Sequence, residues 1–155
     1  MSLQLAGLAR YGACVSTENV ELHRRFYEAL NAGDAEALVA ICDPCVEIRS
    51  VFAAVGGALY HGHEGARKWL ADLVDAWGGE LRVEIEAYFD LGERTFAFGS
   101  LHARGGQSGA MVAMPAAVVA TWRDGHCVSH KAYADREDAI RELGLTEDAL
   151  GPVAP

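Results

Sequence analysis

Residues 26–38 read FYEALNAGDAEAL, and this stretch is the most informative part of the sequence. The pattern predicts a helix that ends at Asn31-Ala32-Gly33 and a second helix that begins at once. Glycine readily takes the left-handed conformation that closes a helix, and the Asp34 carboxylate can cap the free N–H groups of the next one. Two helices joined at so sharp a corner, with strands after them, indicate a specific small fold.

Helical patterns extend from this corner on both sides. The first helix is expected over residues 17–32 and the second over 34–41. A short strand, 46–50, and a loop, 51–59, follow. A third helix is then predicted, because apolar residues recur every three or four positions at Ala66, Trp69, Leu70, Leu73, Val74 and Trp77.

The apolar period changes to two after Gly78. Four strands are therefore expected, over 81–89, 94–104, 111–123 and 126–134. Asp124-Gly125 is typical of a tight turn between two strands, and Asp135 and Gly144 delimit a short last helix. The fold class is α+β: a curved, mostly antiparallel sheet wrapped by about three N-terminal helices into a cone-shaped barrel, with a short C-terminal helix.

Length and composition fit one domain. The chain has 155 residues, of which 51% are hydrophobic and 23% are charged, so it can bury a sizeable core. We expect a domain over 17–145 between a flexible N-terminal extension, 1–16, and a tail, 146–155. The net charge of -9 argues against nucleic acids and anionic membranes as partners. No apolar run is long enough to span a membrane, and no basic signal-peptide start is present, so a cytoplasmic location is expected.

Two short motifs invite a redox or metal interpretation. Cys42 and Cys45 have the spacing of a redox or zinc pair, but a helix precedes them and no second pair is present. His61 and His63 would share a face of a strand, but a helix is expected to begin at Glu64. We interpret both motifs as element ends and expect no metal. No cofactor is expected either, since the chain has no glycine-rich phosphate loop.

Four segments, in this order and spacing, resemble the nuclear transport factor 2-like superfamily and its SnoaL-like branch. They are ALNAGD (29–34), YHGHEG (60–65), WRDG (122–125) and YADREDAI (133–140). The resemblance extends over residues 18–145. It implies a cone-shaped α+β fold around an apolar cavity and a homodimer formed through the sheet. Ketosteroid isomerase, limonene-epoxide hydrolase and polyketide cyclases belong to this superfamily, beside members that bind small molecules.

The catalytic groups of these enzymes are missing from the matching positions. The resemblance places the tyrosine of ketosteroid isomerase on Phe26, its base on Ser50 and its second acid on Ala117. The acids of the hydrolase and of the cyclases both fall on Ala132. Tyr27 follows Phe26 directly and is expected to face a different direction.

Strand alternation, anchored on these positions, predicts the lining of the cavity. The expected lining is apolar with a few polar groups, as in many small-molecule pockets. It comprises Phe26, Ile48, Ser50, Tyr60, Trp69, Phe98, Ser100, His102, Ala117, Val119, Val128, His130 and Ala132. His102 and His130 are the titratable groups of this set, and the strand register places them too far apart to act as a dyad.

The sequence leaves the question of catalysis open. If the chain is an enzyme, we expect His130 to assist proton transfer or hydrolysis on a small hydrophobic metabolite, with Ser50 or Tyr60 orienting it. A non-enzymatic carrier or sensor is the alternative that the missing carboxylates favour. A third possibility is a dimeric interaction module, which predicts a cavity filled by side chains.

Overall fold

A computed structural model describes residues 18–51, 58–78, 80–104, 109–145 and 152–153. The expected extension 1–16 lies outside these residues, as does most of the expected tail. The described part contains no helix with the length and apolar character needed to cross a bilayer.

The helices follow the predicted order. The N-terminal helix covers residues 18–32, and the later ones are α2 (Ala35–Ile41), α3 (Gly62–Trp77) and α4 (Arg136–Leu143). The predicted corner is confirmed in detail. Gly33 has a φ of 67°, and the Asp34 carboxylate accepts a hydrogen bond of 3.0 Å from the backbone N–H of Ala37. The first helix therefore ends, and α2 begins, where the local chemistry requires.

The strands agree with the prediction over most of the chain. They are β1 (Cys42–Ser50), β2 (Ala58–His61), β3 (Arg82–Leu91), β4 (Arg94–Arg104), β5 (Met111–Arg123), β6 (His126–Tyr133) and β7 (Pro152–Val153). Strand β1 begins earlier than expected, and β2 occupies the end of the expected loop 51–59, whose residues 52–57 are outside the described part. Strand β7 was not predicted.

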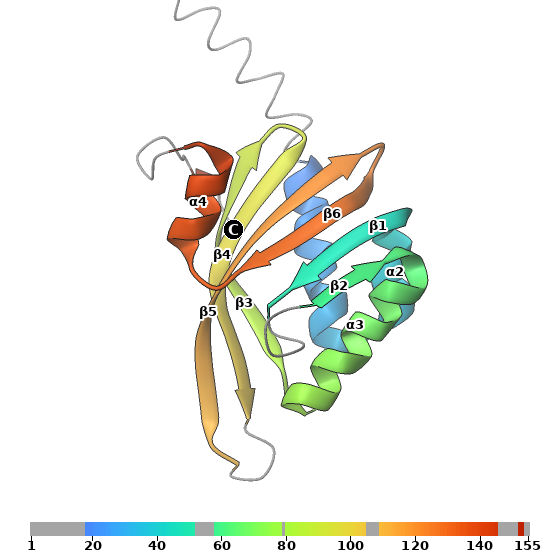
Figure 1. The fold of residues 1–155 in the computed structure, drawn as a ribbon, viewed down its shortest axis with the longest axis vertical. Coiled ribbons are helices and arrows are strands. Elements are labelled where there is room, and N and C mark those ends of the chain that lie inside the picture. Colours follow the sequence, from blue (N-terminus) through green and yellow to red (C-terminus); the bar gives the residue numbers. More distant parts are fainter. Residues whose placement is uncertain (1–17, 52–57, 79, 105–108, 146–151, 154–155) are drawn as a thin grey trace, which may run out of the picture.

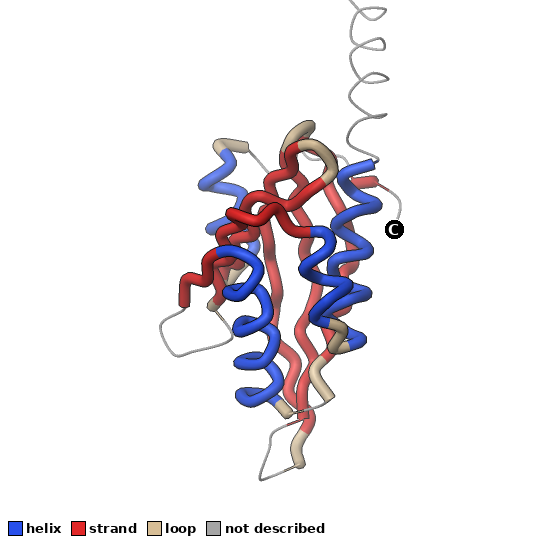
Figure 2. Tube along the Cα trace, turned by 90° about the vertical axis from the view of Figure 1, so that its right-hand side faces the viewer, coloured by secondary structure: helices blue, strands red, loops and turns tan. Residues whose placement is uncertain are grey.

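The strands form one curved sheet in the order β2-β1-β6-β5-β4-β3-β7. Strands β1 and β6 run parallel, and every other neighbouring pair is antiparallel. Strands β2 and β7 form the two edges, so the described strands make an open sheet and not a closed barrel. The tube view shows helices lying alongside the long strands instead of across their ends (Figure 2).

Helices cover the sheet on both faces. The N-terminal helix, α2 and α3 pack on the face that we call the inner face, and α4 packs on the outer face (Figure 1). The inner-face core is the larger one and includes Leu38, Ile48 and Leu70. The outer-face core is smaller and includes Phe89 and Phe96. The candidate site lies in the inner-face core.

A bulge in β3 brings two strands unusually close. The register with β4 shifts between Ile85 and Ala87, which reverses the alternation: Val83 faces the inner core before the shift and Tyr88 after it, with Phe89 in the outer core. Gly99 on β4 pairs with Ile85 at this point. A Cβ atom at Gly99 would lie 1.9 Å from the Glu84 carbonyl oxygen, so only glycine fits there.

Candidate functional site

A narrow pocket lies in the inner-face core, between the N-terminal helix, α3 and the sheet. Its volume is about 30 Å³, which is room for little more than a water-sized group. Its lining residues are Tyr27, Leu30, Ser50, Trp69, Leu73, Val83, Leu101, Ala116, Val118, His130 and Ala132. None of these lining residues is an aspartate, glutamate, lysine or arginine. Because the pocket is so small, most of the hollow expected from the sequence is filled by side chains.

The pocket brings together four of the residues expected from the sequence: Ser50, Trp69, His130 and Ala132. Phe26 and Ile48 are buried in the same core without lining the pocket. The Phe26 ring stacks on His130, with 4.6 Å between ring centroids. Phe26 and Ile48 therefore pack behind the residues that line the pocket.

Tyr60, on β2, is buried but is committed to another partner. Its hydroxyl donates a hydrogen bond of 2.7 Å to Asp72 on α3. Burial, and then this carboxylate, raise the pKa of Tyr60 to about 12. The residue fixes β2 to α3 and does not line the pocket.

Five expected lining residues on β4 and β5 require a correction, since they face away from the pocket. Phe98, Ala117 and Val119 pack in the outer core, and Ser100 and His102 share the Phe98 side of β4. The alternation was anchored on positions that the resemblance supplied, and one of them, Ala117, lies in the outer core. Around Phe98 and Val119 both faces of the sheet are buried, so the period of two alone does not show which side is inner. Ser100 and His102 are half-buried while Leu101 and Ala103 are buried, so at this end of β4 the alternation itself indicated the inner side.

The positions of Val128 and Tyr27 also differ from the expectation. Val128 lies beside the register shift between β5 and β6 and is half-buried outside the pocket. Tyr27 was expected to face away from the site, but it lines the pocket directly. His23, Tyr27 and Leu30 are spaced by four and three residues, so the helical period could have identified this lining face.

Tyr27 and His130 form the polar contact of the pocket. The Tyr27 hydroxyl lies 3.2 Å from Nε2 of His130. Burial lowers the pKa of His130 to about 3, and a contact with its own backbone partly opposes this shift. Burial likewise raises the pKa of Tyr27 well above its usual value. Both side chains are therefore neutral at physiological pH.

A second buried polar chain lies behind the first. The Trp122 indole N–H donates to Thr95 Oγ1 at 2.8 Å, and this hydroxyl lies 2.8 Å from Nδ1 of His23. The Thr95 oxygen accepts from Trp122, and its own proton remains free to donate to a neutral His23 Nδ1. The His23 ring stacks on Tyr27 at 5.2 Å, so the two chains are in contact.

Three ring nitrogens in this region have no hydrogen-bond partner within the described structure: His23 Nε2, Trp69 Nε1 and His130 Nδ1. The residues are 0%, 4% and 2% exposed. Burying a donor without a partner costs about 1–3 kcal/mol, and such groups are rare in native cores. Trp69 and His130 line the pocket, so two of the three nitrogens belong to side chains that a ligand there would contact.

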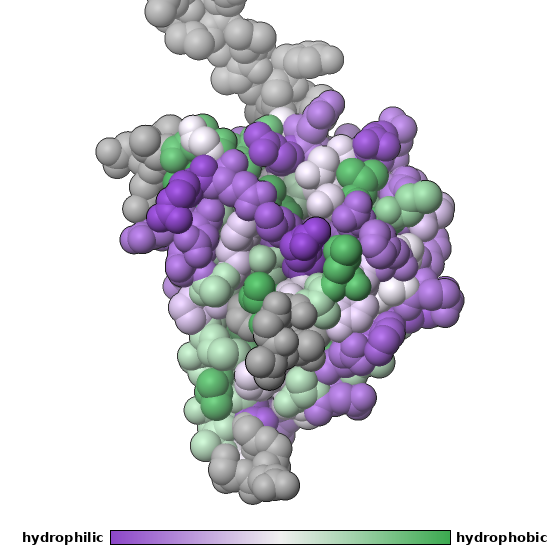
Figure 3. All heavy atoms as spheres, in the orientation of Figure 1, coloured by the Kyte–Doolittle hydropathy of each residue, from purple (hydrophilic) through white to green (hydrophobic). Residues whose placement is uncertain are grey.

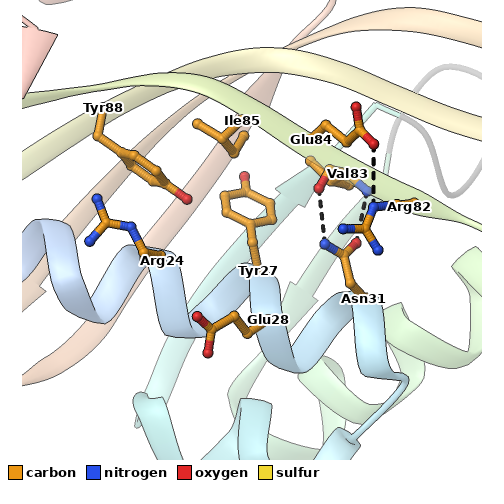
Figure 4. A pocket seen from close by; sticks show the side chains of 9 residues that line it. All are labelled: Arg24, Tyr27, Glu28, Asn31, Arg82, Val83, Glu84, Ile85 and Tyr88. Carbon is orange, nitrogen blue, oxygen red and sulfur yellow. Dashed lines mark hydrogen bonds and ion pairs between the residues drawn. The ribbon is translucent and has the colours of Figure 1, made fainter. Parts of the chain in front are cut away.

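Two wider hollows at the surface share residues with the pocket. One is the groove in Figure 4, of about 290 Å³, which includes Tyr27 and Val83 together with charged residues of the N-terminal helix and β3. The other, of about 350 Å³, includes Ser50 and Ala132 and is bordered by Arg49, Val51, Ala58, Leu59 and Lys131. The second has fewer charged lining residues, Arg49 and Lys131, than the first, which has Arg24, Glu28, Arg82 and Glu84.

The cysteine and histidine motifs have structural roles. Cys42 closes α2 and lies opposite Cys127 in the β1–β6 register, and burial raises the pKa of Cys42 to about 12. Cys45 is exposed. The His63 ring contacts the Cys42 carbonyl at 2.9 Å. Within the described ranges, no group of three or more potential ligands is arranged to hold a metal ion.

Solved structures with this fold include proteins crystallised with small ligands. TerC, co-crystallised with polyporic acid, is 23% identical, with a TM-score of 0.67, and the match covers 81% of this chain and 97% of TerC. A protein with a ketosteroid isomerase-like fold from Catenulispora acidiphila, in complex with trimethylamine, is 17% identical, with a TM-score of 0.67 and coverages of 87% and 98%. A proposed SnoaL-like polyketide cyclase from Jannaschia sp. CCS1 is 20% identical, with a TM-score of 0.67 and coverages of 81% and 91%.

At these identities the structural likeness concerns the fold alone, which is an NTF2-like, or ketosteroid isomerase-like, fold. No curated protein sequence matches the chain. The model of the SnoaL-like domain family matches residues 23–130, which include both buried polar chains and most of the pocket. The chain belongs to the SnoaL-like domain family.

Proposed function

We propose that this protein binds a small, mostly apolar molecule, one end of which enters the inner pocket. The observation that carries the proposal is the pairing of an apolar lining with two buried ring nitrogens, on Trp69 and His130, that lack partners in the described structure. Apolar walls with a few placed polar groups are typical of small-molecule sites.

The size of the pocket limits how the ligand is held. A volume of about 30 Å³ accepts only the tip of a metabolite. The rest would occupy the hollow of about 350 Å³ that shares Ser50 and Ala132 with the pocket. The complexes of TerC with polyporic acid and of the Catenulispora protein with trimethylamine support small-molecule binding by this fold.

We further propose that binding occurs without acid–base turnover, as in a carrier or sensor. A general base works best when its pKa lies near the working pH. With a pKa of about 3, His130 is a weak base, and at neutral pH it is not the imidazolium that would act as a general acid. No carboxylate is present among the described lining residues to replace it. His130 and Ser50 would therefore position the ligand by hydrogen bonding.

A thermal-shift screen of terpenoid, steroid and aromatic metabolites tests this proposal, with every hit then assayed for chemical conversion. Ala132→Leu should abolish stabilisation by the hits, because the added methyl groups obstruct the junction of pocket and hollow. Ala113→Leu, at an exposed site on β5, is the control and should respond like the unmodified protein. Conversion of a hit that His130→Gln abolishes would overturn the carrier proposal.

A dimeric interaction module is the second candidate, because a mostly filled interior is what that function predicts. Apolar side chains gather over the lower end of β5 (Figure 3), where Met111 is 60% exposed. Size-exclusion chromatography with light scattering tests this candidate. A dimer that Met111→Lys converts to a monomer, combined with a screen that yields no ligand, would favour the module over the carrier.

A further inference from the structure

We propose that the buried end of the ligand is a neutral oxygen acceptor, such as a ketone or ester carbonyl, held by Trp69 Nε1–H and His130 Nδ1–H. The inference rests on the proposed function, since it presumes that the inner pocket receives a ligand. It adds the chemical class of the group that enters.

Trp69 supplies the first donor without ambiguity. An indole nitrogen donates and does not accept. Trp69 Nε1 is buried and has no partner among the described residues, while Trp122, the other fully buried tryptophan, donates to Thr95. An oxygen acceptor in the pocket would supply the bond that Trp69 lacks.

His130 supplies the second donor, and its hydrogen bond to Tyr27 identifies the tautomer. The Tyr27 hydroxyl has a single partner in the described part, Nε2 of His130 at 3.2 Å. If the hydroxyl donates, Nε2 accepts and the imidazole proton lies on Nδ1. The reverse assignment would leave the buried phenol proton without an acceptor, which is costly. Nδ1 is therefore an N–H donor, and it too lacks a partner of good geometry.

The two donors belong to rings that border one small space. The rings of Trp69 and His130 both line the pocket, and their centroids lie 5.3 Å apart. A hydrocarbon tip would leave both N–H groups unpaired. An ammonium or amine N–H would oppose two donors. A carboxylate would lose its hydration without gaining a cation, because the described lining contains neither lysine nor arginine. A neutral carbonyl oxygen satisfies the donors without burying charge.

A pair of probes with the same shape tests the inference: cyclohexanone and methylenecyclohexane, in which C=CH2 replaces C=O. Both are titrated into the ¹⁵N-labelled protein by NMR. We expect cyclohexanone to bind about tenfold more tightly, which corresponds to about 1.4 kcal/mol. It should also move the Trp69 indole proton downfield, as a new hydrogen bond does. Equal affinity for the two probes would overturn the inference while leaving the proposed function intact.

Trp69→Phe assigns the effect to one donor. The variant should bind cyclohexanone several-fold more weakly and methylenecyclohexane as before. Trp77→Phe, on the same helix but outside the lining, should leave both affinities unchanged. Equal weakening of both probes by Trp69→Phe would mean that the indole acts by packing alone, which also overturns the inference.

Histidine ¹⁵N shifts test the tautomer independently, because the protonated and bare ring nitrogens of neutral imidazole resonate far apart. We expect Nδ1 of His130 to carry the proton in the free protein, and a dominant Nε2–H form would overturn the assignment. The proposed function fails separately, if neither probe nor any metabolite in the wider screen binds at the pocket.

Discussion

The two faces of the sheet enclose cores of different character. On the outer face, Phe89, Phe96 and Phe98 stack with centroid distances of 5.4–6.2 Å beneath α4. On the inner face, His23 and His130 lie at comparable depth among aromatic rings. Apolar groups of similar shape would avoid the cost of burying these polar atoms. We interpret the outer core as a stabilising core. The inner core is less stabilising than an apolar core of the same shape, because it contains buried polar groups beside the pocket.

Removing an outer-face ring should have the largest effect on stability. Phe96→Ala leaves a cavity in a fully buried position, and we expect the free energy of unfolding to fall by about 4 kcal/mol. Urea unfolding measures the change. Binding of any screened ligand should survive under native conditions, because Phe96 does not line the pocket. A loss below about 1 kcal/mol would contradict the role assigned to the outer core.

Acid should lower the stability of the protein through the two buried histidines of the inner face. Burial holds the pKa of His130 near 3, against an ordinary 6.5, and also lowers the pKa of His23. Well above pH 6.5, these two histidines are neutral in the folded and in the unfolded protein, so stability does not depend on their titration. At lower pH they bind protons in the unfolded chain but not in the folded one, so the free energy of unfolding falls. The loss from His130 is about 2 kcal/mol at pH 5.

Urea unfolding between pH 7 and 5 measures this slope, in a range above the titration of ordinary carboxyl groups. His130→Phe keeps a ring beside Phe26 and removes one of the two buried imidazoles, so its slope should be shallower. Stability that stays constant from pH 7 to 5 would contradict the burial of neutral histidines.

Breaking the second polar chain should lower the free energy of unfolding by less than the acid effect of His23 and His130 together. Thr95→Val preserves shape but removes the hydroxyl that joins Trp122 to His23. Two buried ring nitrogens lose their partner, and we expect a loss of about 2 kcal/mol in urea unfolding. Thr121→Val, at a half-buried site on β5, is the matched control and should change stability little. Equal effects at both sites would mean that the chain contributes nothing.

The smallest effect separates two tryptophans of the same core. Trp122→Phe removes a donor that has a partner, while Trp69→Phe removes one that has none in the described part. In the ligand-free protein, we expect Trp122→Phe to be more destabilising by about 1 kcal/mol, as measured by thermal unfolding. The reverse order would mean that Trp69 already has a strong partner.

Turn and cap chemistry made the order of elements predictable from sequence. The turn at Asp124-Gly125 has positive φ at both residues, as an Asp-Gly pair favours, and Asp135 caps α4 while Gly144 ends it in the left-handed conformation. These signals are local, so a single sequence contains them. Strand β2 was missed because four residues give too short a period to recognise.

The candidate site was less predictable, because its geometry depends on contacts between distant residues. Of the expected lining residues, Ser50, Trp69, His130 and Ala132 lie at the pocket. The bond between Thr95 and His23 joins residues 72 positions apart, and nothing local to either residue announces it. On β5, residues 116–120 are buried on both faces, which removed the alternation that would have separated Val118 from its outward neighbours. On β4, Leu101 lies between the half-buried Ser100 and His102, so the alternation was present and the anchor taken from the resemblance overrode it.

The helix-ending segment has one further consequence. The Asn31 side chain accepts from the Val83 N–H at 2.8 Å and donates to the Val83 carbonyl at 2.9 Å, as Figure 4 shows. It thereby imitates the backbone of an adjoining strand at the open side of β3, which β7 meets only at Tyr88 and Phe89. An amide that occupies these two groups denies them to the backbone of another molecule, so Asn31, in the last turn of the first helix, also blocks this part of the β3 edge from pairing with another strand.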